Sequence, residues 1–199
     1  MTPLLHTLVA AFAHSEEIRK SRFLAQASPV TSPQQALSYV QAASDAAATH
    51  NCWAYRIGQD YRFNDDGEPG GTAGRPILQA IESQGIDRVV VVVTRWYGGI
   101  KLGAGGLARA YGGTAAECLR LAERMPIIAM VRLGLHCDFG ELPRMKSRLK
   151  DMGAEIEQEQ FDAAGVTLHL RLPADRVNDA RILIVDISRG RSEAYALEG

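Results

Sequence analysis

Apolar and polar residues recur along the first 130 positions in patterns that predict both strands and helices. Ser32 is a suitable helix N-cap, with Pro33 at the first helical position and Gln35 three residues after the cap. The unbroken valines of residues 89–93 predict a strand that is buried on both faces of a sheet. The predicted elements are strands at residues 4–13, 16–30, 52–57 and 88–94, and helices after Ser32, from near Thr72, and at residues 104–123.

The pattern starts again after Met125-Pro126, a dipeptide that marks a boundary between two parts of the chain. Six elements follow in the order βαββαβ, which is the order of the ferredoxin-like fold. We therefore predict an α+β protein with two domains, residues 1–129 and 130–199, of which the second is ferredoxin-like. The predicted elements of the second domain are residues 131–137, 141–152, 154–161, 166–172, 174–185 and 191–197.

Composition and charge fit a folded protein without a strong overall charge. Of the 199 residues, 46% are apolar and 23% are charged, and the formal net charge is −1. Residues 1–132 carry 13 Lys and Arg against 11 Asp and Glu, whereas residues 133–199 carry 9 against 12. We therefore expect any anion-binding function to lie on a limited surface of the first domain and not to depend on the charge of the whole chain.

The three cysteines include no Cys-x-x-Cys pair, which indicates a reducing compartment rather than a disulfide framework. The N-terminus lacks the basic and apolar regions of a signal peptide. The longest strongly apolar run, residues 89–93, is too short to cross a membrane. We expect a cytoplasmic protein without a membrane partner.

Residues 98–106 are glycine-rich and lie between the valine strand and the next helix. Backbone N–H groups at a helix N-terminus favour anions, and Gly98, Gly99 and Gly105 leave such groups open to a phosphate. Lys101 lies within this loop and Arg95 precedes it. The loop is therefore a candidate anion-binding site. The alternative is that its glycines only allow a tight turn and close packing.

The spacing Gly103-x-Gly105-x-x-Ala108 formally matches the dinucleotide-binding fingerprint. The acidic residue of that fingerprint ends a second parallel strand, whereas Glu123 follows a predicted helix. We therefore expect neither a dinucleotide nor another cofactor.

A second glycine-rich loop, at residues 64–76, contains three acids. Neighbouring carboxylates can bind a metal ion or act as acid and base. The alternative is turn chemistry, in which the acids accept hydrogen bonds from local N–H groups and Thr72 caps the next helix. Turn chemistry is favoured for Asp65. Both interpretations stay open for Asp66 and Glu68, which Gly71 and the other glycines leave accessible.

His50 and Cys52 lie at the start of a predicted strand. Zinc needs three or four ligands, and no second Cys/His cluster lies at a matching spacing, so we predict no metal site. Cys52 is favoured as a buried core residue, and His50 is either a ligand-binding residue or an ordinary strand end. Trp96 and Tyr97 follow a basic residue, which suits base stacking unless both rings belong to the core.

Three long motifs follow one another along the chain. They are Lys20-Ser21-Arg22-Phe23, the stretch from Asp65-Asp66-Gly67-Glu68-Pro69 to Pro76-Ile77-Leu78, and the stretch from Thr94-Arg95-Trp96-Tyr97-Gly98-Gly99-Ile100-Lys101 to Leu107. In this order they resemble the YigZ/IMPACT family, in which a tyrosine is expected at the position of Trp96. The resemblance extends over nearly the whole chain, and residues from about 136 are similar to the small C-terminal domain of bacterial YigZ proteins.

This resemblance implies a ribosomal-protein-like β-α-β fold for the first domain and a ferredoxin-like second domain. A similar pair of folds occurs in the last two domains of elongation factor G, so RNA, the ribosome or a translation-associated protein is the expected partner. We expect no DNA specificity. Eukaryotic IMPACT relatives restrain a starvation-activated kinase pathway with an additional N-terminal domain, and we do not expect that role to carry over.

Our first hypothesis is a binding protein rather than an enzyme. Arg22, Arg95 and Lys101 would contact RNA phosphates, and Tyr97 or Trp96 would stack on a base.

The alternative hypothesis is a hydrolase acting on a phosphorylated or peptide-like small molecule, with His50, Asp66, Glu68 and Arg95 in its site. A third hypothesis is protein docking by the C-terminal domain, whose acidic balance makes it a poor RNA binder.

Overall fold

The computed structural model describes residues 5–197. Its contacts divide the chain into two compact units, Met1–Ile127 and Ile128–Gly199, which we call unit 1 and unit 2. Both units combine helices with antiparallel sheets. Within the described residues, no helix has the length and apolar character needed to cross a membrane.

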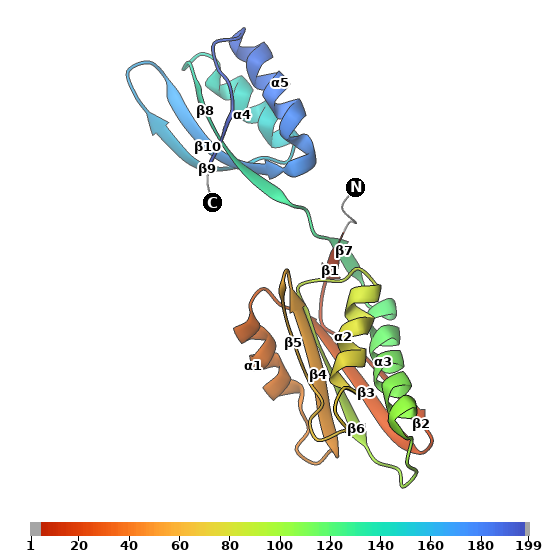
Figure 1. Cartoon of the computed structure of the whole chain (residues 1–199). Helices are drawn as coiled ribbons and strands as arrows, with labels where there is room; N and C mark the ends of the chain where they lie inside the picture. Colours follow the sequence, from red (N-terminus) through yellow and green to blue (C-terminus); the bar gives the residue numbers. More distant parts are fainter. Residues whose placement is uncertain (1–4, 198–199) are drawn as a thin grey trace. The chain divides into compact units, whose positions relative to one another are not determined.

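Unit 1 is built on a five-stranded antiparallel sheet with the order β2-β3-β6-β4-β5, and β1 and β7 form a separate two-stranded sheet. Figure 1 shows α1 on one face of the large sheet and α2 and α3 on the other. The strands are β1 (His6–Leu8), β2 (Phe12–Ile18), β3 (Ser21–Pro29), β4 (His50–Ile57), β5 (Asp60–Asn64), β6 (Val89–Trp96) and β7 (Arg124–Pro126), and the helices are α1 (Pro33–Ala43), α2 (Gly74–Ser83) and α3 (Ala104–Leu121).

The valine run of β6 is buried on both faces, as predicted. Alternate valines of residues 89–93 pack against α2 and α3 on one side and against α1 on the other, and all are fully buried. Burying each such side chain contributes about 1.5–3 kcal/mol. β6 lies at the centre of the sheet and delivers Arg95 and Trp96 to one end of unit 1.

The helix predicted after Ser32 is also confirmed. The Ser32 hydroxyl accepts a hydrogen bond from the backbone N–H of Gln35, and Pro33 occupies the first helical position. The side-chain oxygen of Gln35 in turn accepts a hydrogen bond from the backbone N–H of Thr31. These local contacts depend only on neighbouring residues, which explains why the sequence pattern predicted them correctly.

The first two predicted strands were wrong in their boundaries. The strand predicted at residues 4–13 is interrupted between β1 and the start of β2. The strand predicted at residues 16–30 is divided by a turn, so that it contains the end of β2 and all of β3, which pair as a hairpin. This hairpin is closed by Arg19 and Lys20, whose φ angles are +47° and +67°. Two positive φ angles define a type I′ turn, which Asn-Gly usually supplies. Because Arg-Lys carries no such signal, the sequence pattern did not predict the turn.

Unit 2 has the sheet order β11-β8-β10-β9, with every neighbouring pair antiparallel. This is the strand order of the predicted ferredoxin-like fold. The closing strand is shorter than predicted, and the last helix begins with a 3-10 turn. The elements are β8 (Met130–Cys137), α4 (Leu142–Asp151), β9 (Glu155–Phe161), β10 (Val166–Pro173), η1 (Ala174–Arg176), α5 (Val177–Ser188) and β11 (Tyr195–Ala196).

Candidate functional site

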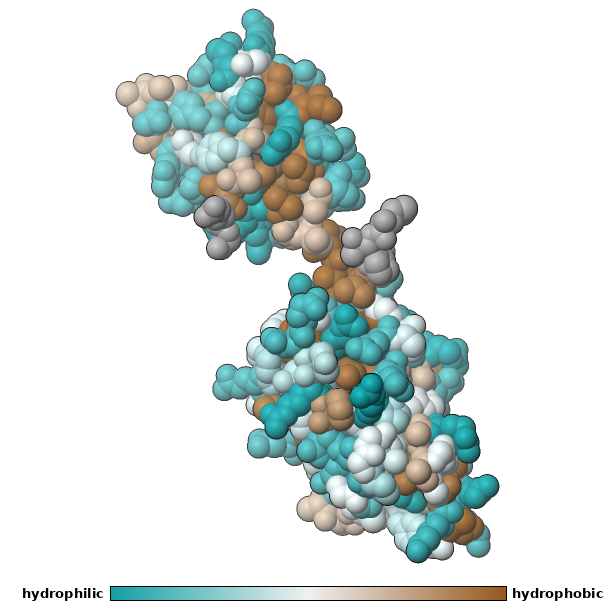
Figure 2. Space-filling view, in the orientation of Figure 1, coloured by the Kyte–Doolittle hydropathy of each residue, from teal (hydrophilic) through white to brown (hydrophobic). Residues whose placement is uncertain are grey.

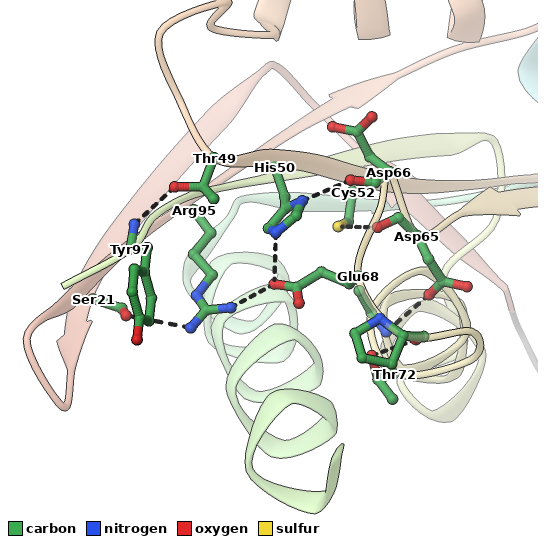
Figure 3. Close-up of polar contacts among 12 residues, drawn as sticks. Ser21, Thr49, His50, Cys52, Asp65, Asp66, Glu68, Thr72, Arg95 and Tyr97 are labelled. Carbon is green, nitrogen blue, oxygen red and sulfur yellow. Dashed lines mark hydrogen bonds and ion pairs between the residues drawn. The ribbon is translucent and has the colours of Figure 1, made fainter. Parts of the chain in front are cut away.

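Glu68 and Arg95 form a buried ion pair where β6 ends (Figure 3). Arg95 Nη1 donates to Glu68 Oε1 over 2.6 Å, and the two residues are 5% (Arg95) and 9% (Glu68) exposed. The Tyr111 hydroxyl, from α3, donates to the same oxygen over 2.7 Å. An unpaired buried charge costs several kcal/mol. These contacts therefore stabilise the Glu68 carboxylate and tie its loop to β6 and α3.

His50 lies beside the same carboxylate. Its Nε2 is 3.8 Å from Glu68 Oε1, and its Nδ1 donates to the Asp66 carbonyl oxygen over 2.7 Å. The carbonyl can only accept, so the proton of the neutral imidazole lies on Nδ1. Nε2 is then free to accept a proton. The side chain as a whole is partly exposed.

The two aspartates of this loop accept backbone hydrogen bonds. The Asp65 carboxylate accepts from Gly71, Ala73 and Gly74, and so supplies the cap of α2. The Asp66 carboxylate accepts from the backbone N–H of residue 51. Among residues 5–197, His, Cys, Asp and Glu form no group of three suited to a metal ion.

Thr72 does not cap α2, contrary to one interpretation of the sequence. The helix begins at Gly74, and the Thr72 hydroxyl donates to the Pro69 carbonyl instead. The carboxylate of Asp65 reaches the helix from nine residues upstream of Gly74. The sequence pattern did not indicate this cap, because patterns of helix capping involve only residues next to the helix.

Cys52 is a core residue. Its Sγ donates to the Asp65 carbonyl over 3.0 Å, and burial raises the pKa of the thiol to about 12. A thiol must lose its proton to act as a nucleophile. At neutral pH Cys52 is therefore protonated and suited to packing.

The remaining contacts of Arg95 are internal. Its Nη2 is 3.5 Å from the Ser21 hydroxyl, and its Cζ lies 5.5 Å from the Phe23 ring centroid and 5.4 Å from that of Tyr97. Its Nε is buried without a hydrogen-bond partner among the described residues. We had expected Arg95 to contact phosphates. Its burial and its pairing with Glu68 instead make it a positioning residue.

Arg22 has the opposite environment, on the other side of the sheet. It is exposed and faces Trp96 across the strand pair, with Cζ 4.6 Å from the ring centroid. Tyr97 is 46% exposed, and its backbone N–H donates to the Thr49 hydroxyl. Lys101 is exposed in the following loop. Cations and aromatic rings thus share this end of unit 1.

We call this exposed set the basic rim. Residues 18–44 and 88–116, which pair through β3 and β6, hold three and four Lys and Arg respectively and no Asp or Glu. In Figure 2, hydrophilic and neutral colours predominate over the visible surface of unit 1. The members of the basic rim are Arg19, Lys20, Arg22, Tyr97, Lys101 and Arg109.

The glycines of the 98–106 loop serve two purposes. A Cβ at Gly98 would lie 1.8 Å from the Lys20 carbonyl oxygen, so this glycine allows the loop to pack against the hairpin turn. Gly99 and Gly103 have positive φ angles and open space where a Cβ would point. Gly105 is exposed in the first turn of α3. Close packing therefore explains Gly98, whereas the others leave backbone accessible.

Within the basic rim, a cleft of about 230 Å³ separates the β2–β3 turn from α3. Arg19 and Arg109 line it on opposite elements. Nη1 of Arg109 lies 3.7 Å from where a Cβ of Gly105 would be, so its guanidinium folds back over the first turn of α3. The other lining residues are Ile18, Leu102, Gly106 and Ala110.

Tyr111, Ser21 and Thr49 belong to the site, but the sequence did not indicate a role for them there. Tyr111 is buried on α3, and its hydroxyl meets a carboxylate 43 residues away. Helical spacing cannot indicate such a partner. Ser21 lies inside one of the motifs that carry the family resemblance, and its partners Arg95 and Gly98 are 74 and 77 residues away.

Comparison with known proteins places these residues in a family. Residues 19–119 match the Impact N-terminal domain, and residues 135–191 match a domain of unknown function, DUF1949. A Thermus thermophilus protein described as "IMPACT family member in pol 5'region" is 48% identical over 175 residues, which cover 87% of this chain and 97% of that protein. The chain belongs to the IMPACT family.

Other members of the IMPACT family are similar over most of their length. YvyE of Bacillus subtilis is 46% identical, covering 94% of this chain and 88% of that protein, and YigZ of Escherichia coli is 34% identical, covering 92% and 93%. A crystal structure described as a hypothetical protein superposes with a TM-score of 0.72 at 32% identity, covering 100% of this chain and 99% of that chain. The likeness therefore includes both units.

Proposed function

We propose that this IMPACT family member is a binding protein for RNA of the translation machinery and that the basic rim is its RNA-binding surface. The observation that carries the proposal is the exposed Arg22 guanidinium on the half-buried ring of Trp96, with the exposed Tyr97 and Lys101 in the chain that follows. Exposed rings stack on unpaired bases, and neighbouring cations bind the phosphates between them. This combination supports single-stranded RNA rather than duplex DNA, whose bases already stack on one another.

The charge distribution supports the same conclusion. The two segments that build the rim carry no carboxylate of their own, although Glu17 of the neighbouring strand β2 lies opposite Arg22, so the excess of positive charge is largest around Arg19, Lys20, Lys101 and Arg109. Phosphate binding by such a surface releases counterions and weakens as salt rises. A local basic surface also explains how a chain with a formal charge of −1 can bind a polyanion.

The ribosome is the context we assign to this RNA. The resemblance to the last two domains of elongation factor G supports it, as does the ferredoxin-like strand order of unit 2. Fold likeness alone does not identify a function, so the ribosome is included as a ligand in the test below.

The hydrolase alternative is less well supported. His50, Glu68 and Arg95 lie together, but Arg95 is committed to the buried ion pair and the Asp66 carboxylate accepts from backbone. Cys52 is protonated at neutral pH, because burial raises its pKa to about 12. We assign this cluster the role of fixing the end of β6, from which the rim projects.

The test is co-sedimentation with ribosomes and binding to single-stranded RNA at low and moderate salt. We would compare the wild type with Arg22→Gln/Lys101→Gln and with Arg75→Gln/Arg181→Gln, which removes two exposed charges from helices elsewhere. Arg95 is left unchanged because it is buried. The rim variant should bind roughly 10-fold or more weakly, with a salt slope reduced by about 1–2.

The control variant should bind RNA as the wild type does. Absence of RNA and ribosome binding at low salt, or equal binding by the rim variant and the wild type, would overturn the proposal. Loss of binding in the control variant to the same extent would show that only net charge matters.

A further inference from the structure

The cleft between Arg19 and Arg109 differs from the rest of the basic rim because two arginine residues line one hollow. Neither arginine forms an ion pair with any residue of the described chain, 5–197. Apolar side chains of Ile18 and Leu102 form part of its wall. Apolar walls strengthen the attraction between a bound anion and nearby cations, because they exclude high-dielectric water.

The charge and shape of these groups favour a phosphate carrying two negative charges. Each guanidinium presents a planar set of N–H donors that matches phosphate oxygens in a bidentate manner. Two such groups balance a dianion, whereas an internal phosphodiester of RNA carries a single charge. A terminal phosphate monoester carries about −1.5 to −2 at neutral pH.

The backbone at Arg19 also points to a binding role. Arg19 and Lys20 adopt left-handed φ angles, which cost roughly 1–2 kcal/mol for each residue other than glycine. The close contact between Gly98 and the Lys20 carbonyl holds this turn in place. Strained backbone of this kind is concentrated at ligand-binding sites. Here it places an arginine at the mouth of the cleft.

We infer that the cleft between Arg19 and Arg109 binds the terminal phosphate of an RNA 5′ end, while the rest of the rim holds internal phosphates and bases. This inference rests on the proposed RNA-binding function. The exposed ring of Tyr97 and the half-buried ring of Trp96 at the same end of the unit favour an RNA over a phosphorylated peptide as the carrier of that phosphate.

The experiment measures the affinity of the full chain for a short single-stranded RNA labelled at its 3′ end. The RNA is prepared with a 5′-monophosphate or a 5′-hydroxyl and is otherwise identical. Wild type should bind the monophosphate form about 10-fold more tightly, a difference of about 1.4 kcal/mol. This preference should shrink as the pH falls below about 6, where the monoester gains a proton.

The decisive variant is Arg19→Gln/Arg109→Gln, with Arg75→Gln/Arg181→Gln as the matched control. The cleft variant should bind both RNA forms equally, and the control should keep the preference. Arg19→Lys/Arg109→Lys keeps the charge and should retain part of the preference. Inorganic phosphate should remove the additional affinity of the 5′-monophosphate RNA and leave the affinity of the 5′-hydroxyl RNA unchanged.

Four other outcomes would contradict the inference. Equal affinity of the wild type for both RNA forms would overturn the cleft assignment and leave RNA binding by the rim intact. A preference that survives in the cleft variant would place the phosphate elsewhere. Failure of both RNA forms to bind would overturn the proposed function as well. Tighter binding of a phosphoserine peptide than of the 5′-phosphate RNA would assign the cleft to a protein ligand.

Discussion

The buried cluster around Glu68 and the basic rim occupy the same end of unit 1, and arginine is central to both. Arg95 faces α2 and α3 and is paired with Glu68, whereas Arg22, on the neighbouring strand, is exposed and lies over the half-buried ring of Trp96. Charge in the first region stabilises a loop, and charge in the second is exposed to solvent. The direction in which a strand points each side chain therefore decides whether an arginine is buried in an ion pair or exposed.

The largest expected effect comes from breaking the buried pair. Arg95→Met leaves the Glu68 carboxylate buried without its cation and should lower the free energy of unfolding by about 3–5 kcal/mol. Arg22→Met should cost at most about 1 kcal/mol, the value of an exposed cation–π contact. Urea unfolding followed by tryptophan fluorescence reports on unit 1, since Trp53 and Trp96 are the two tryptophans of the chain.

Replacing both partners sharpens this comparison. Glu68→Leu/Arg95→Met removes the two charges together and should recover much of the stability that Arg95→Met loses. Equal unfolding free energies for Arg95→Met and Arg22→Met would contradict the distinction between the two regions.

Gly98→Ala should have the next largest effect, because close packing against Lys20, a member of the rim, requires a glycine at this position. The added Cβ would lie 1.8 Å from the Lys20 carbonyl oxygen, and displacing this backbone should cost about 3 kcal/mol. Gly99→Ala is the control, since its Cβ would meet open space and only its positive φ opposes the change, at about 1 kcal/mol. Thermal or urea unfolding of the two variants separates steric overlap from backbone strain.

Tyr111→Phe tests a smaller contribution to the buried cluster. Loss of the hydroxyl leaves Glu68 Oε1 with one donor fewer in a buried position, which should cost about 1–3 kcal/mol. Tyr97→Phe alters an exposed ring and should change stability by less than about 0.5 kcal/mol. A larger loss for Tyr97→Phe than for Tyr111→Phe in urea unfolding would reverse our assignment of the two tyrosines.

The smallest effect concerns the alkaline stability of unit 1. Burial raises the pKa of Cys52 from 9.0 to about 12, so the unfolded thiol loses its proton at a lower pH than the folded one. Its contribution is fully present below pH 9 and is lost as the pH rises toward 12. Cys52→Ala should therefore reduce the decline in unfolding free energy between pH 8 and 10 by about 1 kcal/mol.

Cys137 provides the control for this measurement. It lies in unit 2, and burial raises the pKa of its thiol as well, to about 11. Because both tryptophans belong to unit 1, Cys137→Ala should leave the pH dependence of the fluorescence transition unchanged. An equal change in both cysteine variants would mean that the signal does not report on Cys52.

Local patterns in the sequence predicted much of the fold, and contacts between distant residues account for what they missed. The valines of β6 and the cap at Ser32 depend on spacing alone and were predicted correctly. The burial of Arg95 depends on Glu68, which lies 27 residues away. Alternation along a strand indicates that the side chains point to two faces, but it does not indicate which face packs against a buried carboxylate from another segment.

The β2–β3 turn has a consequence for any selection acting on this protein. Asn-Gly at positions 19 and 20 would suit the left-handed backbone better than Arg-Lys. Selection for thermal tolerance alone would therefore favour the loss of both basic side chains, while selection for ligand binding would retain them. Under the phosphate binding inferred above, the Arg-Lys turn is a position at which these two pressures oppose each other.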